Sequence, residues 1–165
     1  MARISREERQ RKLEELNEGI WQLFLEQGYD ALTFYNIAHY VNWRQSTIQS
    51  YHKSETLVSA IRGRIEPYFL GKLDLSSLES LEQSWLSSLH DNGFVNIIRF
   101  LINLNCNDRS MVELTAYGVR RLEEVSQESL GNDGLDLMQK LMGLSVMMIS
   151  KDRASQEFHT QEPIL

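Results

Sequence analysis

Proline, the residue that most reliably interrupts a helix, occurs only twice in the 165 residues of this chain, at Pro67 and Pro163. Strand-like alternation of apolar and polar residues does not persist, and the glycines fall where helix ends are expected. Long helices joined by short turns are therefore predicted, and the expected fold class is all-α. A hydrophobic content of 42% is enough to build a core, which argues against a chain that is disordered throughout.

Helix caps and breakers divide the first part of the chain into four predicted helices. Ser5 followed three residues later by Glu8 is a capping box, and Gly28 stands where a glycine usually ends a helix. Thr33 can cap the second helix, and Pro67 interrupts the fourth. The expected helices cover about 5–28, 33–40, 44–52 and 54–66.

The rest of the chain predicts four further helices and a polar end. Ser77 is expected to cap the first of them, and Gly131-Asn132-Asp133-Gly134 is expected to break the chain between the last two. The polar residues after Lys151 are expected to form a frayed tail. The helices are expected at about 77–89, 94–104, 108–128 and 135–150.

Residues 33–52 have the features of a helix-turn-helix. Two short helices that cross steeply need a tight turn with a positive φ angle, and Asn42 is one of the few residues besides glycine that tolerate this conformation. The two helices also need a shared apolar core. We expect that core to come from Ile37, Ala38, Trp43 and Ile48.

With that core facing inward, the polar side chains of the third helix are expected to project outward. Side chains of these types form hydrogen bonds to base edges or phosphates, although a solvated helix face has a similar composition. The outward set is Arg44, Gln45, Thr47 and Gln49.

The net charge of -6 argues against a nucleic-acid partner, because neutralising phosphates supplies much of DNA affinity. The charge is unevenly distributed, however. Residues 1–64 carry nine basic and eight acidic side chains, a balance of +1, so the remaining 8 basic and 15 acidic side chains give -7. Five of the basic residues lie in the first twelve positions, where either a DNA-facing arm or a solvated helix start explains them.

The residues from about Arg9 to Ile61 resemble the TetR family of bacterial transcriptional regulators. The family pattern has a first helix ending in Phe-x-x-x-Gly-[Tyr/Phe], a Thr opening the second helix with Ile-Ala within it, and a turn with Gly-Val. It continues with a recognition helix containing Thr-Leu-Tyr, then Tyr-Phe and a Lys, and a fourth helix that starts near a Leu. The matching positions are, in order, Phe24, Gly28-Tyr29, Thr33, Ile37-Ala38, Thr47-Ile48, Tyr51 and Leu57.

The chain departs from that pattern at the turn and after the recognition helix. Asn42-Trp43 replaces the usual Gly-Val, Gln49 replaces a Tyr, and His52 replaces a Phe. The junction at residues 53–55 is one residue shorter than usual. DNA affinity or docking angle is therefore expected to differ from the family's.

The resemblance implies a set of DNA contacts in and around the recognition helix. Thr33 also has a simpler role as a helix cap, and Tyr51 also suits the local core. Arg3 and Arg6 are expected to follow the DNA backbone or to enter a minor groove. The other implied contacts are Arg44, Gln45, Thr47, Gln49, His52 and Lys53.

The resemblance also implies a homodimer formed by the last two long helices, here 108–128 and 135–150. The expected interface residues are Leu122, Met138, Leu141, Met142, Val146 and Met147. A pocket for a small apolar effector is expected from Trp85, Phe94, Phe100, Tyr117 and Met142, although a plain hydrophobic core explains the same residues. The implied domains are a DNA-binding domain at 1–53, a regulatory and dimerisation domain at 54–151, and a flexible tail at 152–165.

The sequence thus predicts a homodimeric, sequence-specific DNA-binding regulator, a repressor of a palindromic operator that a small effector releases. The alternative is a TetR-like helical protein-interaction module without operator binding. No catalytic set, metal-spaced cluster or phosphate loop is apparent, so we expect no enzyme, no cofactor and no metal. We expect a cytoplasmic protein that does not associate with a membrane. This expectation rests on the lone Cys106 and on the lack of a signal peptide or of an apolar run long enough to span a membrane.

Overall fold

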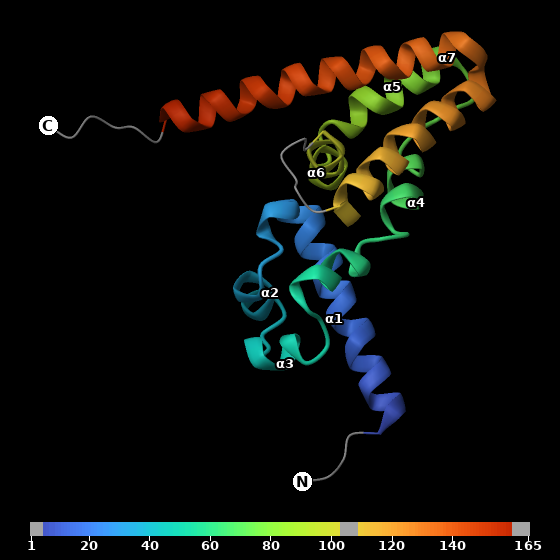
Figure 1. Cartoon of the computed structure of the whole chain (residues 1–165). Helices are drawn as coiled ribbons and strands as arrows, with labels where there is room; N and C mark the ends of the chain where they lie inside the picture. The colour runs from blue at the N-terminus through green and yellow to red at the C-terminus, as the bar shows by residue number, and fades with distance from the viewer. Residues whose placement is uncertain (1–4, 103–108, 160–165) are drawn as a thin grey trace, which may run out of the picture. The chain divides into compact units, whose positions relative to one another are not determined.

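A computed structural model describes the chain at residues 5–102 and 109–159, and every regular element within these ranges is helical (Figure 1). The prediction of an all-α fold is therefore confirmed. The chain divides into two compact units, Met1–Tyr68 and Phe69–Leu165, which we call the head and the body. The predicted boundary, after residue 53, lies 15 residues before this division.

The long first helix of the head, α1, spans Arg6–Gln27. As predicted, the Ser5 side chain caps it by accepting a hydrogen bond of 3.1 Å from the Glu8 N–H. Gly28 ends it with a φ of 84° and donates its N–H to the Phe24 carbonyl at 2.9 Å. The buried face of α1 supplies much of the head's core, with Leu16, Ile20, Trp21, Leu23 and Phe24.

Five short elements follow α1 in the chain. A 3₁₀ turn, η1 (Tyr29–Ala31), leads into α2 (Phe34–Tyr40) and α3 (Gln45–Gln49), and a second 3₁₀ segment, η2 (Ser54–Ala60), follows. The prediction of a single helix over 54–66 was wrong, because the chain instead turns at Gly63, which has a φ of 79°. The next helix, α4 (Ile65–Leu70), contains Pro67 in its first turn, where a missing N–H costs no helical hydrogen bond.

In the body, α5 (Leu78–Ser88) and α6 (Asn92–Leu101) both pack against α7 (Figure 1). The predicted cap of α5 is confirmed, since the Ser77 hydroxyl accepts the Ser80 N–H at 3.0 Å. Asp91 caps α6 in the same way through the Phe94 N–H at 2.8 Å. Most of α6 is buried, in agreement with its apolar sequence.

The last element, α7 (Arg109–His159), consists of two helical limbs that meet at Gly131. Figure 1 shows the second limb folding back from this point. Gly131 has a φ of 69°, so the predicted break is confirmed there, but residues 132–134 are already helical. The prediction that the helix ends near Ser150 was wrong, because no proline or glycine interrupts the good helix formers before His159.

Candidate nucleic-acid interface

The turn between α2 and α3 has the geometry expected from its residues. The Thr33 hydroxyl caps α2 by accepting the Asn36 N–H at 3.2 Å. Asn42 follows the end of α2 with a φ of 55°, the only positive φ at a non-glycine residue in the described chain. The Trp43 N–H then donates to the Ala38 carbonyl at 3.0 Å, which closes the turn.

The shared core beneath the turn is smaller than predicted. Ile37 and Ile48 are fully buried, whereas Ala38 and Trp43 are half-buried. Helix α1 lies directly against the turn, because a side chain at Gly19 would place its Cβ 2.3 Å from a methyl group of Val41. This role of Gly19 was not predicted, because a glycine inside a helix does not by itself indicate which segment packs against it.

The burial of Ile48 turns the polar side of α3 toward solvent, as predicted. The exposed side chains include Arg44, Gln45, Thr47 and Gln49. Residues 31–54, a stretch of 24, contain no Asp or Glu in a chain that has 23 acidic residues. An anionic partner would therefore meet donors here without a nearby carboxylate on the same segment.

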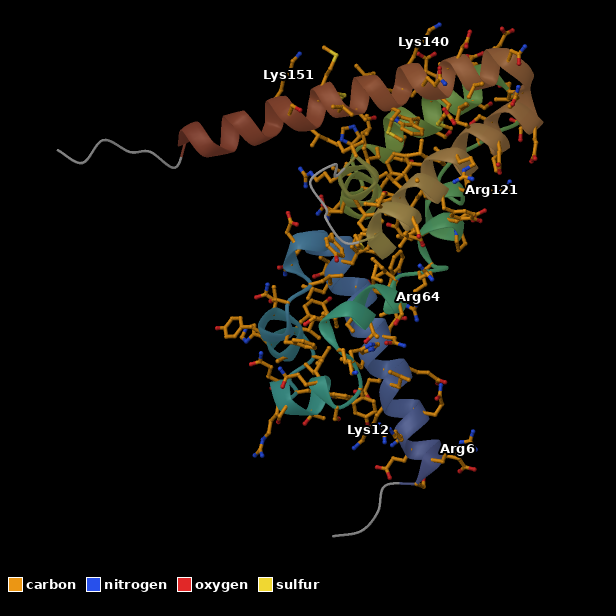
Figure 2. All side chains as sticks on the ribbon, in the orientation of Figure 1. Arg6, Lys12, Arg64, Arg121, Lys140 and Lys151 are labelled. Carbon is orange, nitrogen blue, oxygen red and sulfur yellow. The ribbon has the colours of Figure 1, made fainter. Side chains whose placement is uncertain are left out.

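The remaining predicted contacts have different surroundings. Thr33 and Lys53 are exposed, and Arg6 is exposed at the start of α1, where Figure 2 labels it. Tyr51 is half-buried, with its ring centroid 6.1 Å from that of Trp43. Arg3 lies outside the described residues.

His52 is not part of this surface, so its assignment as a DNA contact was wrong. Both the Tyr51 and the His52 N–H donate to the Ile48 carbonyl at 2.9 Å, and this turn directs the His52 ring into the head, where it is buried. Its Nε2 lies 2.7 Å from Asn17 Oδ1 on α1, and its Nδ1 lies 3.4 Å from the Thr56 hydroxyl. Burial lowers the pKa of the imidazole below its ordinary 6.5, because the charged form loses hydration.

Arg9 contacts the end of α3, although no role was predicted for it in the site. Its guanidinium carbon lies 5.6 Å from the centroid of the Tyr51 ring, and its Nη2 donates to the Ser50 carbonyl at 3.4 Å. These contacts join the first turns of α1 to the end of α3, 41 residues away in sequence. The basic character of residues 1–12 was noted, but nothing local indicated this partner.

The five predicted pocket residues differ in their exposure to solvent. Trp85, Phe94 and Phe100 are buried, whereas Tyr117 is 51% exposed and Met142 is intermediate. The rings of Trp85 and Phe94 pack edge to face at 5.2 Å, and Phe69 stacks on Phe94 at 4.2 Å. This close ring packing agrees with the alternative of a plain core.

The predicted dimer residues also separate into two groups. Leu122, Met138 and Leu141 are buried within one chain, so their assignment to an interface was wrong. The reason is that α5 and α6 pack on α7 and take up much of its apolar surface. Met142 and Val146 are half-buried, and Met147 is 59% exposed.

Several apolar side chains of α7 are exposed, and Met147 is the one among them that was predicted at the interface. They lie on both limbs, on which Figure 2 labels Arg121 and Lys140 as landmarks. The exposed apolar set is Val112, Tyr117, Val119, Leu144, Met147 and Met148.

The body matches a known family over nearly its whole described length. The family model described as the tetracycline repressor LuxT C-terminal domain matches residues 62–149, which is more than half of the chain. The chain belongs to the TetR-like family of transcriptional regulators. The resemblance noted in the head and the match to the body therefore indicate the same family. No curated protein matches this TetR-like chain.

Two structural features are absent from the described residues of this TetR-like protein. None of the described helices is both long enough and apolar enough to cross a membrane. Within the same residues, no group of three or more His, Cys, Asp or Glu side chains is arranged to hold a metal ion.

Proposed function

We propose that this TetR-like protein is a sequence-specific DNA-binding repressor in which the head reads DNA. The observation that carries the proposal is the turn at Asn42, which leaves the polar side of α3 exposed within a stretch free of acidic residues. Thr33 and Lys53, both exposed, flank this surface and are proposed backbone contacts. The proposed location is the cytoplasm, because DNA is the proposed partner.

The chemistry of the exposed side chains supports base reading as well as phosphate binding. Arg44 can donate two hydrogen bonds to the O6 and N7 of a guanine, and Gln45 or Gln49 can pair with the N6 and N7 of an adenine. Thr47 adds a hydroxyl that donates or accepts. Arg6 on α1 is a proposed phosphate contact outside the recognition helix.

We propose that the protein acts as a homodimer through α7. Support comes from its exposed apolar side chains, because monomeric proteins rarely leave such groups clustered in water. Leu144, Met147 and Met148 lie three and four residues apart, which places them on one face of the second limb. Two heads related by a two-fold axis would bind a palindromic site.

Release from DNA by a small apolar effector is the last part of the proposal. Because Phe69, Trp85 and Phe94 are in ring contact, an effector that binds among them has to separate these rings. Binding of an effector is therefore expected to change the fluorescence of Trp85.

The test is selection of bound sequences from a random pool of double-stranded DNA by the purified full chain at low salt. We expect a palindromic motif, and we expect the Arg44→Ala/Gln45→Ala variant to bind it about 30-fold more weakly by fluorescence anisotropy. Arg62→Ala removes one charge from another exposed position of the head and is the matched control. If no sequence is enriched, the protein-interaction module replaces this proposal.

A further inference from the structure

We infer that Arg9, Tyr51 and Trp43 form a brace that sets the orientation of α3 on the head. Arg9 and Tyr51 are then positioning residues for DNA reading and do not themselves contact DNA. The inference rests on the proposed DNA-binding function and adds to it the groups that determine how accurately α3 is placed.

Helix α3 has few means of holding its own position. It has five residues, from Gln45 to Gln49, and its N-cap residue Arg44 makes no side-chain capping hydrogen bond. A helix this short is not stable by its own hydrogen bonds, because the conformational entropy lost in forming the first turn exceeds the free energy gained from the hydrogen bonds of one turn. Contacts from outside the helix must therefore determine its orientation.

The two aromatic residues of the brace, Trp43 and Tyr51, lie at opposite ends of α3. Trp43 lies two residues before the helix, directly after the positive-φ residue Asn42, and Tyr51 lies two residues after it. The two rings are 6.1 Å apart and tilted by 52°. An aromatic contact across the ends of so short a helix limits its rotation.

Arg9 connects this pair of rings to the long helix α1. Its guanidinium lies 5.6 Å from the centroid of the Tyr51 ring, within the range of a cation–π interaction. The guanidinium also donates to the carbonyl oxygen of Ser50, the C-cap residue of α3. The last carbonyl groups of a helix have no hydrogen-bond partner within the helix itself, so a donor from outside can satisfy them. The planar guanidinium, with five donors and a face that stacks on rings, suits both contacts together better than a compact, strongly hydrated lysine ammonium.

The brace also accounts for a departure from the family pattern. Where that pattern has a valine after the turn, this chain has Trp43, which gives Tyr51 an aromatic neighbour. The unusual turn and the half-buried Tyr51 are therefore parts of one arrangement.

The first test compares specific and non-specific DNA affinity over a series of salt concentrations. For Arg9→Ala we expect about a fivefold loss of affinity for the selected motif, little change for random DNA, and an unchanged salt slope. Arg9→Lys should not restore the affinity, Tyr51→Leu should reproduce the loss, and Tyr51→Phe should bind like the unmodified chain. Combining Arg9→Ala with Tyr51→Leu should add little to either change alone.

Arg11→Ala is the matched control, because Arg11 is an exposed arginine two positions further along α1 and projects from a different side of the helix. The inference is overturned if Arg9→Ala weakens specific and random binding equally, lowers the salt slope by about one, and is rescued by lysine, since this is the behaviour of a phosphate contact. A loss of affinity in Tyr51→Phe also overturns it, because the hydroxyl would then be the contact.

A second measurement does not involve DNA and separates the brace from the proposed function. Amide hydrogen exchange of the full chain should accelerate in Arg9→Ala at Ile48 and Tyr51, and remain unchanged in the middle of α1 at Ile20. Unchanged exchange at Ile48 and Tyr51 overturns the brace. Accelerated exchange in a protein that binds no DNA sequence retains the brace and rejects only the proposed function.

Discussion

The helices that carry the proposed DNA surface, α2 and α3, have seven and five residues, whereas those of the body have 11, 10 and 51. The short pair has one buried residue in each helix, Ile37 and Ile48, and the head adds directed polar contacts such as the Thr33 cap and the His52–Asn17 hydrogen bond. The core of the body is built on close packing of large side chains, with the rings of Phe69, Trp85 and Phe94 in mutual contact.

This difference shows which kinds of substitution each unit tolerates. Directed contacts make the head sensitive to the chemistry of single groups and to their protonation as well. A unit held by packing is sensitive to volume and to close approach of backbones. The predictions below test that contrast, from the largest expected effect to the smallest.

Removal of the central ring of the body should have the largest effect. Trp85 is fully buried, and its indole N–H donates to the Ser145 hydroxyl at 2.9 Å. We expect Trp85→Ala to lower the free energy of unfolding by about 3–5 kcal/mol in urea denaturation. Leu86→Ala, at the adjacent and 40% exposed position, is the control and should cost far less. A small loss in Trp85→Ala would show that packed volume does not hold the body.

Two glycines of α7 give a sharper test within the same helix. A Cβ on Gly134 would lie 2.6 Å from the Ser126 carbonyl oxygen, whereas a Cβ on Gly143 would meet nothing within 4 Å. Gly134→Ala should therefore lower the unfolding free energy by about 1–3 kcal/mol through overpacking. Gly143→Ala should raise it by up to about 1 kcal/mol, because alanine favours the helix. Equal effects at the two positions would mean that the space around each glycine is not what matters.

The smallest expected effect is a pH dependence of stability that arises in the head. Burial lowers the pKa of His52 in the folded state, whereas in the unfolded chain the imidazole keeps its ordinary pKa of 6.5. As the pH falls, the unfolded chain is therefore protonated at this residue before the folded chain is. Stability should therefore fall as the pH is lowered from 7.5 to 5.5, measured by thermal unfolding of the full chain. His52→Asn should reduce this slope, and His39→Asn, at an exposed position of α2, should leave it unchanged. An unchanged slope in His52→Asn would contradict the assignment.

The parts of the fold that could be predicted depend on hydrogen bonds between residues close in sequence. The caps at Ser5, Thr33 and Ser77 each act on an N–H three residues ahead, and the breaks at Asn42 and Gly131 depend on which residues tolerate a positive φ. Such features need no knowledge of the rest of the chain. The exposure of the polar side of α3 followed from the same kind of argument, once Ile48 was assigned to the core.

The errors concern residues whose surroundings come from distant segments. His52 was assigned to the surface because its chemistry suits DNA, but Asn17 and Thr56 hold it inside the head. Leu122 and Met138 were assigned to a dimer because α7 is rich in apolar residues, but part of that apolar surface is buried within one chain.

By itself, the sequence determined the all-α class, the helix caps, the two positive-φ breaks and the family resemblance of the head, because each depends on local backbone preferences. Only the tertiary structure decided which apolar face of α7 is buried and that Arg9 lies against Tyr51. A helix with apolar residues on several sides does not specify which side its neighbours cover, and an arginine does not specify its partner 41 or 42 positions away. Those choices are made by packing, when segments far apart in the chain compete for the same contacts.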